Sequence, residues 1–324
     1  MANSVEAALK TILEMKTDDI RKSAMMALKV ALVGSEDEIV WLQEHFRGRT
    51  SAPGDLRRLA DTLKLFEAPP DSETLKKINE CAFACVTPGA AASIAERGMS
   101  IIIPIYTIGN EGEWVHFTRE ILDTRWDLHL ALGRNLPGLR PDVVEYLIVN
   151  VACINTEVAV ASAVFAKIPG IGPIYPGVAL GDTIILTKNQ IYLAFRLAGA
   201  CGLAIDLVHR RFDVVSIIGG GFLWRTLARE SAGLVPTPVG VALKGAIAYA
   251  GTYVVGKAVF QYFDTGSRMD RSTERKLYRT ALESGKEVAR GALGRIVRRP
   301  RPFRRKSHQA PASDQRTPPD APSK

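Results

Sequence analysis

The stretch Val239–Phe263 reads VGVALKGAIAYAGTYVVGKAVFQYF and is almost an unbroken apolar helix. It closes a region that starts at Pro141, is rich in Gly and Ala, and is interrupted by single charged residues. A helix that crosses a bilayer needs about 20 predominantly apolar residues. The region therefore predicts long apolar helices at 143–166, 178–200 and 239–263. They would form either a membrane bundle or the core of an unusually apolar water-soluble bundle.

Small residues recur along the last of these helices at intervals of about one turn. Positions four residues apart lie on the same face of a helix, and small side chains there let two helices approach closely. The pattern predicts a seam at which helices pack. The seam residues are Gly240, Gly245, Ala248, Thr252 and Gly256.

Polar residues form a stripe along the middle helix. Asp182, Asn189 and Arg196 are spaced seven residues apart, and Lys188 flanks them. Charged side chains inside a membrane usually pair or line a cavity, because they are costly to bury alone. The stripe is therefore predicted to be structural and to face other helices.

The chain as a whole predicts an all-α fold, a multi-helical bundle with Gly/Ala-rich hydrophobic helices. Helical periodicity continues through Ile20–Val33 and Ser72–Cys85, whereas 101–106 is a short apolar run that suits a buried extended piece or an interfacial loop. Five regions follow from the composition. They are a small N-terminal helical bundle (1–68), an amphipathic helical connector (69–140), a hydrophobic helical domain (141–266), a basic amphipathic helix (267–299) and a disordered Pro-rich tail (300–324).

The net charge of +8 is concentrated near the C-terminal end of the sequence. Residues 267–306 hold eleven Arg and three Lys against four acidic residues, a balance of +10. Such a run can be a solvated tail, or it can bind an anionic lipid surface, with about 1 kcal/mol for each basic residue near the surface. Nucleic-acid binding is disfavoured because few aromatic side chains accompany the charge. The candidate lipid-surface patch is Arg298, Arg299, Arg301, Arg304, Arg305 and Lys306.

No catalytic, cofactor-binding or metal-binding residue is predicted. The four cysteines do not form a disulfide framework in a chain of 324 residues, and the five histidines are scattered. Gly251–Lys257 matches the first part of a phosphate-binding loop, but Ala258 stands where the Mg²⁺-binding Ser or Thr is required. The sequence thus favours a protein without enzymatic activity.

Three segments, 182–191, 222–230 and 244–253, carry a resemblance to a known family. They read DTIILTKNQI, FLWRTLARE and KGAIAYAGTY. Together they resemble a bacterial family of unknown function that occurs beside, or fused to, Era-like and dynamin-like small GTPases. The resemblance covers about residues 130–264 and implies a multi-helical, often membrane-bound protein. This chain departs from the fused members because it shows no GTPase domain.

Two hypotheses follow. The first is a membrane-associated structural or regulatory protein of the bacterial inner membrane, with a cytoplasmic C-terminus placed by the positive residues that flank the helices. A separately encoded small GTPase and a second copy of the chain are its expected partners. The alternative is a soluble, cytoplasmic helical domain that docks on a GTPase or self-associates. Single charges every 10 to 15 residues favour this alternative, because a core helix needs a solvated edge.

Overall fold

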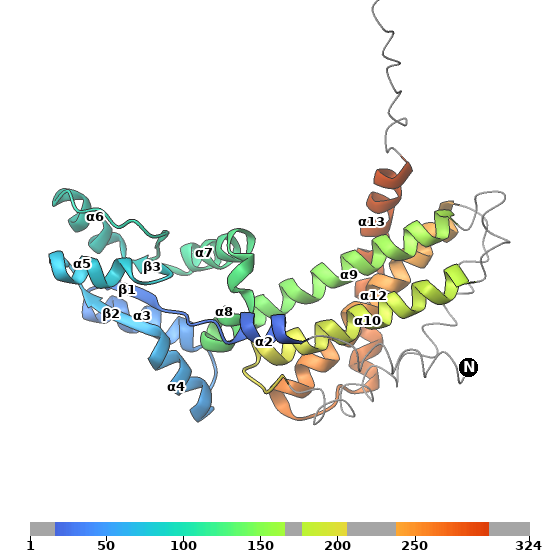
Figure 1. Cartoon of the computed structure of the whole chain (residues 1–324), viewed down its shortest axis with the longest axis horizontal. Coiled ribbons are helices and arrows are strands. Elements are labelled where there is room, and N and C mark those ends of the chain that lie inside the picture. The colour runs from blue at the N-terminus through green and yellow to red at the C-terminus, as the bar shows by residue number, and fades with distance from the viewer. Residues whose placement is uncertain (1–16, 166–176, 206–237, 298–324) are drawn as a thin grey trace, which may run out of the picture.

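The structure is a computed structural model that describes residues 17–165, 177–205 and 238–297, and the side chains of 177–184 and of 297 lie outside this description. The molecule is elongated, with an α/β unit at one end and a bundle of long helices at the other (Figure 1). The side chain of Asp182, the segment 222–230 and the basic patch at 298–306 lie outside the described residues.

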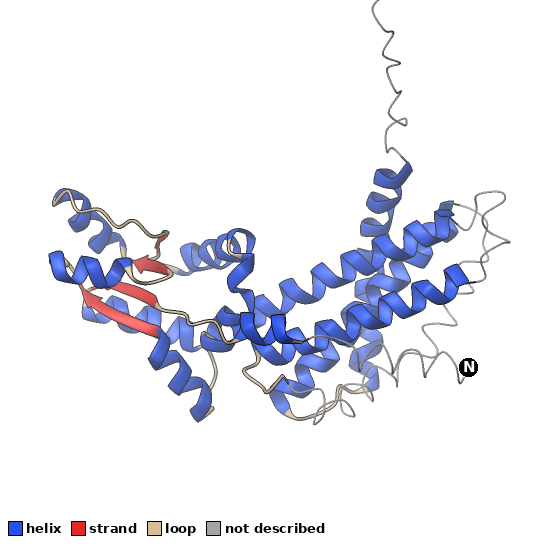
Figure 2. Cartoon of the chain, viewed as in Figure 1, coloured by secondary structure: helices blue, strands red, loops and turns tan. Residues whose placement is uncertain are grey.

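The α/β unit contains four parallel strands in the order β2-β1-β3-β4. Figure 2 shows the strands in red. The first strand is central because the chain pairs it with β2 on one side and with β3 on the other. The strands are β1 (Val30–Gly34), β2 (Leu63–Glu67), β3 (Phe83–Val86) and β4 (Ile105–Thr107), and the helices are α2 (Asp18–Ala24), α3 (Glu36–Arg47), α4 (Pro53–Thr62), α5 (Ser72–Asn79), α6 (Pro88–Glu96) and α7 (Glu111–Thr124).

The two faces of the sheet are covered by different helices. Alternate residues of a strand point to opposite faces. Leu32 and Phe83 accordingly pack with α3 and α7 in the main core, whereas Val33 and Ala84 pack with α5 and α6 in a second cluster. Because both faces are buried, β1 and β3 are apolar along their whole length, as parallel strands usually are.

This sheet corrects the all-α prediction. The protein is mostly helical, but strands run through both segments, 1–68 and 69–140, that the sequence predicts as a helical bundle and a helical connector. The predicted helix at Ile20–Val33 is split into α2 and β1, and that at Ser72–Cys85 into α5 and β3. The apolar run at 101–106 ends in the edge strand β4. Short apolar runs fit a buried strand as well as a buried helical turn, and tertiary pairing decides between them.

Two short helical turns and one helix lead into the bundle. The turns η1 (Trp126–Leu128) and η2 (Pro137–Leu139) flank α8 (His129–Asn135), which contacts α2, α4 and the first bundle helices. The bundle itself contains α9 (Arg140–Phe165), α10 (Gly177–Ala200), α12 (Pro238–Thr265) and α13 (Arg271–Val297). The first three coincide with the long apolar helices that the sequence predicts.

The basic helix α13 packs lengthwise on α12 and also touches α9. Its small residues form the contact: Ala281 lies in a cluster with Tyr249, and Ala289 lies in a cluster with Val160 and Val241. The opposite face of α13 carries charged side chains that are exposed. The predicted basic amphipathic helix is therefore an integral element of the bundle.

Candidate functional site

A buried polar network lies at the centre of the bundle, where α9, α10 and α12 meet. Asn155 is fully buried, and its amide nitrogen donates to the hydroxyl of Thr252 at 2.9 Å. Its amide oxygen accepts a hydrogen bond of 2.7 Å from Asn189. Gln190 donates to Thr252 at 3.3 Å, and Thr252 donates to the carbonyl of Ala248 at 2.9 Å. The network joins three helices in one register.

The structure places the residues of the predicted polar stripe in different surroundings. Asn189 belongs to the central network, whereas Lys188 is exposed. Arg196 is half-buried one turn beyond Tyr192, and its positive charge acts on the buried His129 of α8. Burial lowers the pKa of His129, the hydrogen bond to the Leu122 carbonyl opposes this, and the Arg196 charge adds to the lowering, so the pKa lies below its ordinary value. The stripe thus does not form a single site.

The seam residues of α12 lie against three neighbouring helices. A Cβ atom added to Gly245 would come within 2.6 Å of Val160 of α9 and 2.9 Å of Ala289 of α13. A Cβ added to Gly256 would come within 2.7 Å of Ile148 of α9. Gly240 is also buried, and Ala248 packs between α9 and α10. At Gly245 and Gly256 the side chains of neighbouring helices come so close to the α12 backbone that a side chain on either glycine would clash with them.

The α/β unit is joined to the bundle by a buried ion pair. Arg140, the first residue of α9, donates two hydrogen bonds of 2.9 Å to the carboxylate of Asp55 in α4. Thr50 and Arg58 also donate to this carboxylate, and the Nε of Arg140 donates to the carbonyl of Gly133 in α8. Burial raises the pKa of Asp55, but the bonds and the charge of Arg140 outweigh it and leave the pKa below its ordinary value.

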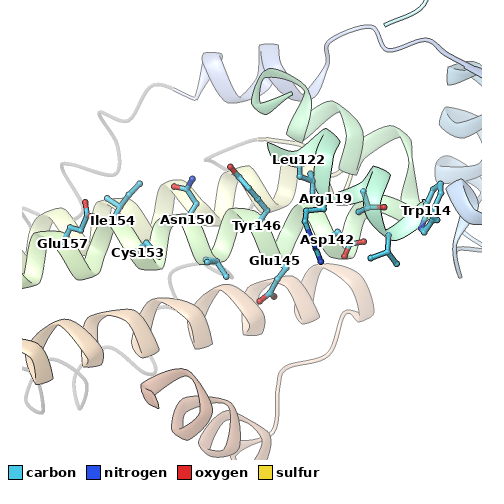
Figure 3. A pocket seen from close by; sticks show the side chains of 13 residues that line it. Trp114, Arg119, Leu122, Asp142, Glu145, Tyr146, Asn150, Cys153, Ile154 and Glu157 are labelled. Atoms are coloured by element: carbon cyan, nitrogen blue, oxygen red, sulfur yellow. The ribbon is translucent and has the colours of Figure 1, made fainter. Parts of the chain in front are cut away.

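A groove of about 650 Å³ runs between α7 and α9 (Figure 3). Exposed or half-buried apolar side chains form part of its wall, among them Trp114, Val115 and Ile154. Acidic side chains follow one another along α9 on the same wall, and Arg119 of α7 is the basic residue of the lining. The acidic residues are Asp142, Glu145 and Glu157. The groove therefore combines apolar surface with an acidic rim.

The carboxyl ends of β1 and β3 are the edge at which parallel α/β sheets usually bind ligands, because the direction of strand addition reverses there. In this protein Glu38 fills that edge. One of its carboxylate oxygens accepts hydrogen bonds from the backbone NH of Ser35 (3.0 Å), the hydroxyl of Ser35 (2.7 Å) and the hydroxyl of Thr87 (2.9 Å). These bonds, led by the Ser35 backbone NH, hold the pKa of Glu38 below its ordinary value.

Several of these features are absent from the predictions made on sequence. Asn155 carries only a weak signal, because Asn150 on the same helix is exposed and residue type alone does not say which of the two is buried. The pair of Asp55 and Arg140 carries none, because 85 residues separate its members. The groove also could not be foreseen, because it depends on how α7 lies against α9.

Compared with known protein families, with characterised proteins and with solved structures, the chain matches none of them. The fold defines a mostly helical protein with a small parallel sheet. The resemblance to the GTPase-associated family stays a prediction.

Replacing Asn155 by leucine is expected to lower the free energy of unfolding by about 1 to 3 kcal/mol, because the amide of Asn189 would be left without its buried acceptor. The matched control is Asn150→Leu on the same helix, where the side chain is exposed and the change should stay within about 0.5 kcal/mol. Urea unfolding followed by circular dichroism measures both. Equal midpoints for the two variants would mean that the network does not stabilise the bundle.

Proposed function

We propose that the protein is a non-enzymatic adaptor that attaches to the surface of a membrane without inserting its helical bundle. The basic segment 298–306 binds anionic lipid headgroups, and the α/β unit with the bundle forms the scaffold that presents partner-binding surfaces. A separately encoded small GTPase, which the family resemblance implies, and a second copy of the chain are the proposed partners.

The observation that carries this proposal is the position of α13. The close approach of Gly285 to the backbone of Ala246 sets the middle of α13 beside the first half of α12. The outer face of α13 exposes Arg275, Arg279 and Arg290 together with Glu283 and Glu287. A charged side chain at the centre of a bilayer costs about 2.5 to 3.5 kcal/mol on insertion scales. A bundle that keeps α13 on α12 would place several such charges in lipid, so this arrangement favours an aqueous surrounding.

The carboxyl edge of the sheet supports the non-enzymatic part of the proposal. Helix N-termini at such an edge commonly bind phosphate groups through their free NH groups. Here the negative charge of Glu38 already occupies the start of α3, and a Cβ on Gly34 would lie 2.7 Å from Thr87. A phosphate would meet a fixed carboxylate and little space, so nucleotide binding at this edge is disfavoured.

A second candidate is an integral membrane protein. Pro137–Phe165 and Pro238–Thr265 are long and apolar enough to cross a bilayer. The core helices of a water-soluble bundle also meet this criterion, and 78% of the apolar window of the second segment is buried inside the protein. Insertion would require α13 to leave α12 and to expose the small residues beneath it.

Washing isolated membranes that contain the full chain separates the two candidates. We expect alkaline carbonate and high salt to release the protein, because attachment by basic surface residues is electrostatic. Exposed charges are already screened beyond about 8 Å at physiological ionic strength, and added salt shortens this distance. Protein that stays with the membrane after carbonate would favour the integral candidate. Protein that never sediments with membranes would contradict both.

Ending the chain after Val297 should reduce co-sedimentation with anionic vesicles while leaving the bundle intact, because α13 is retained. Ending it after Gly266 would not be a suitable test, since that deletion would also uncover Tyr249 and Val241. Vesicles of neutral lipid are the control, and the thermal midpoint of the shortened chain checks its fold. Equal binding of the full and shortened chains to anionic vesicles at low salt would contradict the role of the basic segment.

A further inference from the structure

We propose that the groove between α7 and α9 binds residues 298–306 of this same chain, with the sequence RRPRPFRRK. This interaction goes beyond the proposed membrane attachment and can be measured without lipid. When lipid is present, the groove and the headgroups would compete for one segment.

The first argument is position. Arg295, two residues before the end of α13, donates to the carboxylate of Glu157 at 2.6 Å. Glu157 lines the groove at the end of the α9 wall (Figure 3). The chain therefore leaves α13 beside the end of the groove, and the segment needs no long tether to enter it.

The second argument is length. From Glu157 to Asp142 the groove follows 15 residues of α9, or about 22 Å at 1.5 Å for each residue. The nine residues of 298–306 span up to about 30 Å when extended. A segment that starts at Glu157 can thus reach the far acidic residue.

The third argument is complementary chemistry. The segment carries six basic residues and no acidic residue, interleaved with Pro300, Pro302 and Phe303. The groove is lined by three carboxylates and one Arg, beside an apolar wall that includes Trp114. Glu145 pairs with Lys257 and Glu157 with Arg295, so among the described residues Asp142 is the carboxylate of the lining that has no ion pair. Segments rich in Pro commonly dock in aromatic grooves because their extended form is already ordered. The alternation of cations with Pro and Phe therefore matches a groove that has Asp142 at its far end and an apolar wall.

The test is disulfide formation within the full chain. Asn150, which is exposed in the groove, and Pro302 are both replaced by cysteine, and Cys153 is replaced by serine to remove the neighbouring thiol. The remaining cysteines are buried. We expect rapid intrachain crosslinking under mild oxidation, read by peptide mass spectrometry. The control carries the same two cysteines but has serine at Arg301, Arg304 and Arg305, so the tether length is unchanged.

Docking raises the effective concentration of the two thiols, so the control should crosslink about tenfold more slowly. About 0.5 M NaCl should have a similar effect on the first variant, because salt screens the charges. Moving the first cysteine from Asn150 to Ile185, exposed on α10, should also slow the reaction. Rates that do not differ among these variants, or crosslinks that form mainly between two chains, would overturn the proposal. Thermal midpoints confirm that each variant is folded.

Discussion

Replacing Arg140 by leucine is expected to lower the free energy of unfolding by about 3 to 5 kcal/mol, the largest effect of a single side-chain loss that we predict. Arg140 is 8% exposed and Asp55 5% exposed, so the substitution would leave a buried carboxylate without its main counter-charge. Arg58 and Thr50 would still donate to Asp55, but neither replaces the bidentate contact. Because this pair joins α4 to α9, the loss should also loosen the α/β unit from the bundle.

Chemical unfolding at pH 7 measures this effect, and Arg47→Leu is the matched control. Arg47 also pairs with a carboxylate, that of Glu44, but their side chains are 43% and 60% exposed. Exposed pairs contribute about 0 to 1 kcal/mol. The double variant Asp55→Leu/Arg140→Leu should lose less stability than the sum of the losses of its two single substitutions. In the double variant no buried charge is left without its partner. Additive losses in this cycle would contradict the assigned pairing.

The same pair predicts a dependence on pH. The folded state lowers the pKa of Asp55, so the carboxylate contributes stability that is fully present above its unfolded pKa of about 3.9. This contribution is lost as the pH falls through the lower, folded value. Asp55→Asn should therefore show a shallower loss of stability below about pH 4 than the unchanged chain.

The helical bundle could be predicted from sequence because each of its long apolar helices exceeds the length of any strand. The sheet could not, because β1 and β3 are four or five residues long and follow helices without a Gly or Pro between them. In β1 the residues VALVG would suit the last turn of α2 equally well. Only the pairing of β1 with β2 and β3, which joins distant segments, fixes the extended form.

The candidate sites show the same limit. Spacing along α10 marks Asn189 and Arg196 as unusual for an apolar helix, but it does not say which residue each one meets. Asn189 meets Asn155 across 34 residues of sequence, and Lys188, its neighbour, points to solvent. Periodicity identifies which residues share one face of a helix. Which residues form a site also depends on how two helices are rotated relative to each other.

Replacing Gly245 by leucine is expected to lower the free energy of unfolding by about 1 to 3 kcal/mol or more through overpacking. Even the first carbon of the new side chain would lie 2.6 Å from Val160 and 2.9 Å from Ala289. Helix propensity acts in the opposite direction, since Gly costs up to about 1 kcal/mol in a helix. The steric clash should outweigh the gain in helix propensity, because the nearest atoms belong to packed side chains of α9 and α13.

Gly294→Leu is the control for that competition. Gly294 also lies in a helix, but no atom would come within 4 Å of an added Cβ, so only the propensity gain remains. We expect this variant to be as stable as the unchanged chain or slightly more stable. If Gly245→Leu behaves in the same way, α13 does not rest on α12 in solution. The charges of α13 would then no longer argue against insertion of α12 into lipid, and the integral candidate would gain the support that the surface-bound one loses.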